Sequence, residues 1–248
     1  MCYHYSINKT ATEIAERYNI LPRLPQIDPF PVHYHTNGFD HEYLPIVLQN
    51  VKEGDLNIDF MQWGMVPAWV KGEEHASGIR SKTLNARYET IDVKPSFKHA
   101  FKYRPCLVPA TGYFEWMHYN GKKYPFFIFV PDMEIFSFAG IWDEWISEQT
   151  GEILHSFAII TCEANRLTSK IHNARKRMPV ILDPQNENEW LMADEIPKKK
   201  ALLKPFDSSR MNAYTISRLI TDRNRDSNIP GVVRPFKYPE LNDLELSG

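Results

Sequence analysis

Cysteine is scarce in this sequence, and the three cysteines that occur lie far apart. Cys2, Cys106 and Cys162 form no C-x-x-C pair, and isolated cysteines in odd number are not typical of a zinc site or a disulfide framework. Cys106 and Cys162 lie in apolar segments, where we expect them to be buried strand residues that act as small hydrophobes. The pattern therefore predicts neither a metal site nor a bound cofactor.

Long apolar runs and a strong net charge are also missing. The longest apolar stretch, Phe126–Val130, is far shorter than the ~20 residues that a membrane-spanning helix needs. The first thirty residues contain charged side chains and no apolar core, so we expect no signal peptide and a cytoplasmic protein without a membrane partner. With a formal charge of −2, the chain could bind a polyanion only through a local basic groove.

The composition is otherwise that of a globular protein, with 43% hydrophobic and 13% aromatic residues in 248, enough for one substantial core. Asn120-Gly121 predicts a type I′ hairpin between two strands, because both central residues of that turn need positive φ. Apolar patterning predicts strands at 44–48, 56–62, 107–108, 113–119, 123–130, 135–142, 153–161, 179–182 and 213–217.

Helical signals are shorter and concentrated toward the second half. Short helices are predicted at 10–18, 95–101, 163–171, from 183 onward and at 196–203, with a proline-rich connector at 21–31 and an irregular loop at 67–82. We expect Lys198–Lys200 to form a solvated helix face. The whole pattern predicts one α+β domain over residues 1–222, in which a mainly antiparallel sheet curls into a barrel-like core with short flanking helices, and a loosely ordered tail at 223–248.

Cys2 is the most informative residue. Initiator methionine is normally removed before a small residue, so the mature chain is expected to begin at Cys2. An α-amine titrates near ~8 and a thiol near ~8.5, so both are partly nucleophilic at neutral pH. Such an aminothiol can condense with an aldehyde to an imine, to which the sulfur adds to close a thiazolidine ring. The alternative is that a cysteine at this position has no role.

Polar residues in two other segments are awkward for a purely structural explanation. Glu115 lies in the aromatic segment Tyr113–Trp116; facing inward it would have a raised pKa and could donate a proton, whereas facing outward it would be solvated. Asn85 and Arg87 are two residues apart and share a face if the chain is extended, although a loop with an Asx turn explains them equally well.

Two more segments could contact an anionic polymer. His172 precedes Arg175, Lys176 and Arg177, which suits a phosphate backbone, although a basic loop is usually solvated surface. The indoles of Trp63 and Trp69 flank a turn and would serve either core packing or base stacking.

These segments, in this order, resemble the SRAP family (SOS-response-associated peptidases, also called abasic-site processing proteins) over roughly residues 1–220. The matching segments are Met1-Cys2, Trp63–Trp69, Asn85–Thr90, Arg104–Trp116, Ala139–Trp142, Thr161–Asn165, and Ile171-His172 with Arg177–Val180. Two departures stand out: His4 replaces an arginine of the family's C-G-R opening, and the I-H-x-R-M-P block is longer here by three residues.

The resemblance implies a protein that responds to DNA damage by crosslinking itself to abasic sites in single-stranded DNA, with possible lyase activity. By analogy, Cys2 would form a thiazolidine with the ring-opened sugar, Glu115 would shuttle protons, and Asn85 would hold the aminothiol. His172 would assist ring opening, strand cleavage or reversal. The DNA contacts implied are His4, Trp69, Arg87, Lys98, Trp116 and either or both of Arg175 and Arg177. We expect a monomer that works near the nucleoid.

Two other functions stay open at this point. In an N-terminal-nucleophile peptidase or amidohydrolase, the Cys2 sulfur would attack an amide while its own amine acts as base. In a noncatalytic single-strand binder, Cys2 would be incidental and its replacement would leave DNA binding unchanged.

Overall fold

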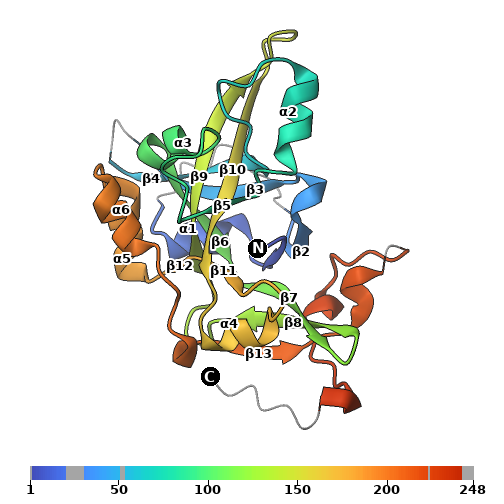
Figure 1. Cartoon of the computed structure of the whole chain (residues 1–248). Helices are drawn as coiled ribbons and strands as arrows, with labels where there is room; N and C mark the ends of the chain where they lie inside the picture. The colour runs from blue at the N-terminus through green and yellow to red at the C-terminus, as the bar shows by residue number, and fades with distance from the viewer. Residues whose placement is uncertain (1, 21–30, 51–53, 223, 242–248) are drawn as a thin grey trace.

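Five strands close into a barrel at the centre of the molecule (Figure 1). The computed structural model describes residues 2–20, 31–50, 54–222 and 224–241, so nearly all of the predicted connector at 21–31 lies outside the described residues. The barrel strands are β3 (Tyr43–Gln49), β4 (Leu56–Trp63), β6 (Pro105–Ala110), β9 (Phe136–Ile146) and β10 (Ile153–Glu163). They pair in the order β10–β4–β3–β6–β9, and β9 pairs back to β10 to close the ring. Only the β4–β10 pairing within this ring is parallel.

Three short strands extend the barrel. They are β5 (Asn85–Arg87) and β11 (Arg177–Pro179), which both pair with β10, and β12 (Ile181–Leu182), which pairs with β9. A second, fully antiparallel sheet has the order β13–β8–β7–β1–β2. Its members are β1 (His4–Ile7), β2 (His33–Asn37), β7 (Gly112–Tyr119), β8 (Lys122–Phe129) and β13 (Asn212–Thr215). The predicted α+β fold with a barrel-like, mainly antiparallel core is confirmed.

The hairpin between β7 and β8 is built as the sequence predicts. Asn120 and Gly121 both have positive φ, 48° and 73°, which a type I′ turn requires. At the other end of β7, a Cβ on Gly112 would lie 2.1 Å from the ring of Phe127. Only glycine therefore lets β7 cross Phe127 at this point, and this close approach fixes the start of the strand that carries Glu115.

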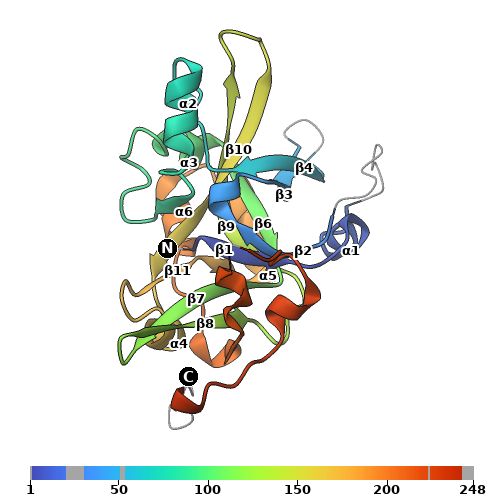
Figure 2. The same cartoon turned by 90° about the vertical axis from the view of Figure 1, so that its right-hand side faces the viewer.

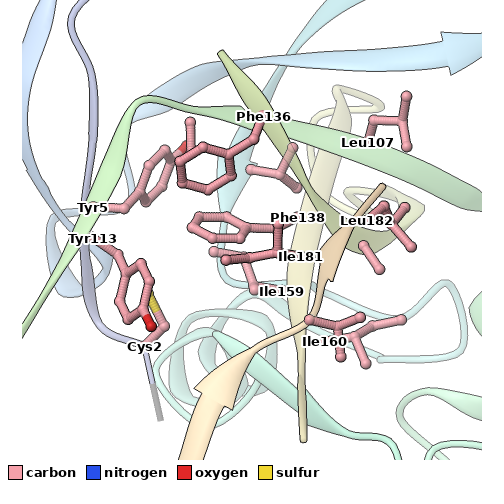
Figure 3. Close-up of a cluster of buried hydrophobic side chains, with 14 of the residues drawn as sticks. Cys2, Tyr5, Leu107, Tyr113, Phe136, Phe138, Ile159, Ile160, Ile181 and Leu182 are labelled. Carbon is pink, nitrogen blue, oxygen red and sulfur yellow. The ribbon is translucent and has the colours of Figure 1, made fainter. Parts of the chain in front are cut away.

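One large apolar core joins the barrel to the second sheet. Figure 3 shows Tyr5, Phe136 and Phe138 within this core, with Cys2 and Tyr113 together at its margin. Trp63 is fully buried and donates its indole N–H to the carbonyl oxygen of Leu84, 2.9 Å away. The core thus extends to Leu84, just before β5, and to Cys2 near the N-terminus.

Six α-helices of 6 to 9 residues lie around the strands in the described parts of the chain. They are α1 (Ala11–Arg17), α2 (Glu73–Arg80), α3 (Lys98–Tyr103), α4 (Arg166–Ile171), α5 (Pro184–Met192) and α6 (Ile196–Leu202). Helix α1 begins with the expected capping box, in which Thr10 and Glu13 bond each other's backbone. Among the described residues, no helix combines the length and the apolar character that crossing a bilayer requires.

Three predictions were wrong in detail. The segment 67–82 is not an irregular loop throughout, since α2 forms over Glu73–Arg80. Helix α4 begins at Arg166, because β10 continues to Glu163 and the Asn165 side chain caps the helix. Lys199 is not solvated: it is 1% exposed, and its ammonium donates to the backbone carbonyls of Phe101 and Lys102, both at 2.8 Å, where α3 ends.

Residues 224–241, here named the C-terminal strap, follow the second sheet. The strap holds two short 3₁₀ turns, Pro230–Val233 and Pro239–Leu241. It bonds to the edge strand β2 through Asn228 and to β13 through Phe236, whose N–H donates to the carbonyl of Thr215. Figure 2 shows the strap in red.

Candidate functional site

Cys2 lies directly before β1, which pairs with both β2 and β7 and so places the start of the chain beside Glu115. The Cys2 side chain is fully buried, and its Sγ contacts the carbonyl oxygen of His4 at 3.6 Å. Burial, reinforced by the nearby Glu115 carboxyl, raises the pKa of the thiol well above its ordinary value. The Cys2 sulfur is therefore an uncharged thiol at neutral pH.

Asn85 holds the backbone of Cys2. It is the first residue of β5, a strand that pairs in parallel with β10 and so brings the amide to the margin of the core. The Asn85 side-chain NH₂ donates to the carbonyl oxygen of Cys2 at 2.8 Å. Its other atom, Oδ1, is buried and has no hydrogen-bond partner within the described part of the chain. The extended alternative, in which Asn85 and Arg87 belong to one strand, is the observed one.

Glu115 faces inward from β7 and is 4% exposed, which decides the question that strand alternation left open. Burial raises the pKa of its carboxyl from 4.5 to about 8. Its Oε1 lacks a hydrogen-bond partner among the residues that the structure describes. Glu115 is thus a mostly protonated acid at neutral pH, with an acceptor atom left open.

His172 ends helix α4 and lies against Glu115. Its Nδ1 is 2.9 Å from the carbonyl oxygen of Arg177 and 3.3 Å from Oε1 of Glu115. A carbonyl can only accept, so Nδ1 carries the proton and Nε2 is left as an acceptor. Burial lowers the pKa of His172 to about 4. At neutral pH Glu115 is therefore mostly an uncharged acid and His172 is an uncharged imidazole, although the 3.3 Å between them lies within the range of an ion pair.

A pocket of about 520 Å³ opens over this pair. The residues that line it are Tyr3, His4, Phe39, Glu115, Trp116, His118, Lys123, His172, Ala174, Arg175 and Thr221. Four residues that the sequence indicated as site residues, besides Glu115, are among them: His4, Trp116, His172 and Arg175. Cys2 and Asn85 are both buried and are not among these lining residues, and the Cys2 thiol is fully enclosed.

The two arginines of the loop after His172 have different environments. Arg175 is exposed and lines the pocket. The Arg177 side chain is 12% exposed, pairs with Glu89, and donates to the carbonyl of Thr161 at 2.7 Å. Arg175 is therefore free to meet an anion, whereas Arg177 fastens the loop to β10. Arg87 is exposed at the end of β5 and, with Arg175, opposes the rise that burial causes in the pKa of Tyr3.

Aromatic side chains form the rest of the pocket wall. Trp116 meets His4 edge to face, with ring centroids 4.9 Å apart. Burial lowers the pKa of His4 to about 3, so this imidazole is uncharged. On the other side Tyr3 packs on Phe39, centroids 5.1 Å apart, and Phe39 is 49% exposed. Neither Tyr3 nor Phe39 is among the residues that the sequence indicated; an exposed phenylalanine in the turn Asn37–Asp40 was the signal that could have found the second.

Four of the residues assigned to DNA do not line the pocket: Arg87, Arg177, Trp69 and Lys98. Trp69 is 50% exposed, and its indole N–H donates to the carbonyl of Pro95 at 3.2 Å. Lys98 is exposed as the first residue of α3. That Trp69 and Lys98 contact DNA stays a prediction. The contact would be on the surface beyond the pocket and not in its lining. Cys106 and Cys162 are fully buried in β6 and β10, as expected.

Comparison with known proteins gives consistent matches. The family model described as SOS response associated peptidase (SRAP) matches residues 1–223. The "Abasic site processing protein YoqW" of Bacillus subtilis is 32% identical over 231 residues, covering 92% of this chain and 97% of that protein. The "Abasic site processing protein HMCES" of Gallus gallus is 35% identical, covering 67% of this chain and 54% of that longer protein. A crystal structure of a Bacteroides thetaiotaomicron protein superposes with a TM-score of 0.88 at 38% identity, covering 95% of this chain and all of that one.

Proposed function

Because the chain belongs to the SRAP family, SOS response associated peptidases, we propose that it processes abasic sites in single-stranded DNA by linking Cys2 covalently to the opened sugar. The names of the relatives in Bacillus subtilis and Gallus gallus support abasic-site processing. The covalent step is our inference from the residues around Cys2. It would take place during the response to DNA damage, in the cytoplasm at the nucleoid, with the protein acting as a monomer.

The observation that carries the proposal is a pair of open acceptors beside Cys2. Asn85 Oδ1 and Glu115 Oε1 are both buried, and the described residues offer neither of them a hydrogen bond. Leaving such atoms unpaired costs about 1–3 kcal/mol each, so a partner is expected. Removal of Met1 would give Cys2 a primary amine, which supplies N–H donors at this place. We therefore infer that Asn85 Oδ1 and Glu115 Oε1 accept hydrogen bonds from the free amine of Cys2.

The chemistry then proceeds in two steps. An abasic deoxyribose opens to an aldehyde, and the Cys2 amine attacks its C1′ to give a carbinolamine, which loses one water to form an imine. The imine is still protonated on nitrogen, so when the Cys2 sulfur adds to its carbon the nitrogen keeps one hydrogen, and the thiol proton returns to the group that protonated the departing hydroxyl. The product is a thiazolidine, with one water released overall. Because the thiol is uncharged at neutral pH, its proton must be removed as the carbon–sulfur bond forms.

Glu115 and His172 have the properties that these proton transfers require. A carboxyl with a pKa of about 8 donates a proton to the departing hydroxyl at neutral pH and can recover it from the thiol. Nε2 of His172 remains an acceptor because Nδ1 is bonded to the carbonyl of Arg177. His172 can therefore take the sugar hydroxyl proton during ring opening. The same pair would serve strand cleavage or reversal of the link.

Contacts with the DNA backbone follow from the pocket wall. Arg175 is an exposed cation that lines the pocket, as Lys123 is, and would bind a phosphate, with Arg87 at the end of β5 as a second contact. Trp116 would pack against a nucleotide beside the lesion. Trp69 and Lys98, which lie beyond the pocket, would meet the strand further along.

A gel assay tests the proposal. Processed protein is incubated with an oligonucleotide that contains one abasic site, and the mixture is then denatured. We expect a shifted band that disappears with Cys2→Ala and with an N-terminal extension that removes the free amine. A normal shift from either variant would contradict the proposal, as would the absence of any shift from wild-type protein whose Met1 has been removed.

The peptidase alternative is less well supported. A sulfur nucleophile that attacks an amide acts as a thiolate, but the Cys2 thiol is enclosed and its pKa is raised. The binder alternative gives the open acceptors at Asn85 and Glu115 no donor. Peptide cleavage without a gel shift would support the first alternative, and binding unchanged by Cys2→Ala without a shift would support the second.

A further inference from the structure

The C-terminal strap reaches the wall of the pocket, although all of it lies beyond residue 223, where the match to the family model ends. Asn228 Oδ1 accepts from the backbone N–H of Tyr34 at 2.7 Å, so it occupies the open edge of β2. Thr221, three residues before the strap, lines the pocket. The strap runs beside β2, where its turn Pro230–Val233 contacts that strand (Figure 2).

A chain of three polar side chains connects the strap to the pocket. The hydroxyl of Ser227 lies 2.7 Å from Nδ1 of His35, and Nε2 of His35 lies 2.8 Å from Nδ1 of His4. Burial lowers the pKa of His35 to about 4 and that of His4 to about 3, so both rings are uncharged at neutral pH. Each ring then carries one proton, and the direction of the whole chain is fixed by which atom donates at the Ser227 end.

The direction decides what His4 presents to the pocket. If the Ser227 hydroxyl donates to Nδ1 of His35, then Nε2–H of His35 donates to Nδ1 of His4, and Nε2 of His4 carries a hydrogen. With the opposite direction, Nε2 of His4 would be a lone pair. Phosphate and most sugar oxygens are acceptors, so only the first direction suits a DNA strand.

The strap also packs against the apolar residues that support Trp116 in this wall of the pocket. Val232 is fully buried in an apolar cluster with Phe114 and Phe127, and Trp116 packs against the same cluster. Trp116 in turn meets His4 edge to face. The strap thus supports both ring systems of this wall, one by hydrogen bonds and the other by packing.

We propose that the C-terminal strap is a positioning element of the DNA pocket, in which Ser227, acting through His35, holds His4 as an uncharged hydrogen-bond donor to a backbone oxygen of the strand. The inference rests on the proposed function for the identity of the ligand. The arrangement within the free protein can be measured without DNA.

The test compares Ser227→Ala with Tyr238→Phe. Tyr238 is also in the strap, where its hydroxyl donates to the carbonyl of Ile216 at 2.9 Å, but it does not line the pocket. Imidazole ¹⁵N shifts of the free protein report the tautomer, and binding is measured on single-stranded DNA with an unreactive tetrahydrofuran abasic analogue. We expect wild-type His4 to be protonated at Nε2, and Ser227→Ala to mix the tautomers and weaken binding about three- to tenfold.

Two controls separate the proposed role of Ser227 from a loss of charge and from a general effect on the strap. The salt dependence of binding should be the same for wild type and Ser227→Ala, because no charge is removed. Tyr238→Phe should keep the wild-type tautomer and affinity. Wild-type tautomers in Ser227→Ala, or an equal loss of affinity in both variants, overturn the inference. Wild-type protein that does not bind the DNA, while its tautomers still respond to Ser227→Ala, overturns the proposed function instead.

Discussion

Two buried glutamates, Glu187 in helix α5 and Glu115 in strand β7, have very different surroundings. Glu187, in helix α5, is 6% exposed and accepts from Arg17 at 2.8 and 3.3 Å and from the hydroxyl of Ser137 at 2.6 Å. Glu115 is 4% exposed, has the imidazole of His172 at 3.3 Å, and keeps an unpaired Oε1 among the described residues. Both carboxyls are similarly buried, yet only Glu187 has hydrogen bonds to both of its oxygens among the described residues.

The difference separates a structural group from a chemical one. A buried carboxyl that stabilises a fold is surrounded by donors, as Glu187 is, and breaking such a set is costly. Glu115 is left without them next to Cys2, and burial raises the pKa of its carboxyl to about 8, whereas the bonds from Ser137 and Arg17 oppose the rise that burial causes in the pKa of Glu187. Unpaired buried groups that the fold does not need are typical of active sites, where pKa values are adjusted for catalysis.

The largest expected effect is on the crosslinking rate. Glu115→Gln removes the proton donor and keeps the shape, so we expect the rate to fall by ~10²–10⁴-fold. Glu187→Gln should crosslink at nearly the wild-type rate when assayed well below its unfolding temperature. Single-turnover gel kinetics with an abasic oligonucleotide measure both. Similar losses in the two variants would mean that Glu115 has no special role.

The two carboxyls should also differ in how much their burial costs in stability. In wild type, Glu115 must be protonated on folding at any pH between its unfolded pKa of 4.5 and its folded pKa of about 8, so stability falls as the pH rises through this window. Glu115→Gln avoids that cost and should be more stable than wild type by about 3 kcal/mol at pH 7, with no difference below pH 4.

Glu187→Gln should change the stability at pH 7 less than Glu115→Gln does, because burial also raises the pKa of Glu187 but the bonds from Ser137 and Arg17 oppose that rise. Urea unfolding of the two variants and wild type at pH 4, 7 and 8.5 gives these differences. A Glu115→Gln variant that is less stable than wild type at pH 8.5 would show that the ionised carboxylate is satisfied after all.

The smallest effects should distinguish the two arginines near His172. Arg175→Ala should weaken binding of single-stranded DNA several-fold and reduce the salt slope by ~0.7, since one phosphate contact is lost. Arg177→Ala should mainly lower stability, because its guanidinium bonds Glu89 and Thr161. Fluorescence anisotropy at several salt concentrations separates the two outcomes. An unchanged slope for Arg175→Ala together with a reduced slope for Arg177→Ala would reverse the assignment.

The barrel and its strands could be predicted because their signals are local, whereas the short strands β1 and β2 were missed. Alternation in 56–62 and the Asn120-Gly121 turn act through neighbouring residues, and the structure follows both. Helix α2 was missed because it has only two buried residues, Ala76 and Ile79, and begins after Gly72 without a side-chain cap. Lys199 was misjudged because its burial depends on the distant carbonyls of Phe101 and Lys102.

The candidate site also depends on contacts between residues that are distant in the sequence. The sequence indicated Glu115, Asn85 and His172, but only the fold decides that Glu115 faces inward and that His172 contacts it. Likewise, local sequence could not choose between Arg175 and Arg177, because the choice depends on Glu89, 88 residues away from Arg177. The His4–His35 contact joins two strands across 31 residues and has no local signal.

Peptide mapping of the purified conjugate by mass spectrometry shows whether the amine and the thiol of Cys2 both end bonded to the sugar carbon. We predict an adduct confined to an N-terminal Cys2 peptide, one water lighter than the sum of its parts, with a thiol that resists alkylation and a link that borohydride does not alter. An adduct on a lysine, or a Cys2 thiol that still alkylates in the conjugate, would contradict the account.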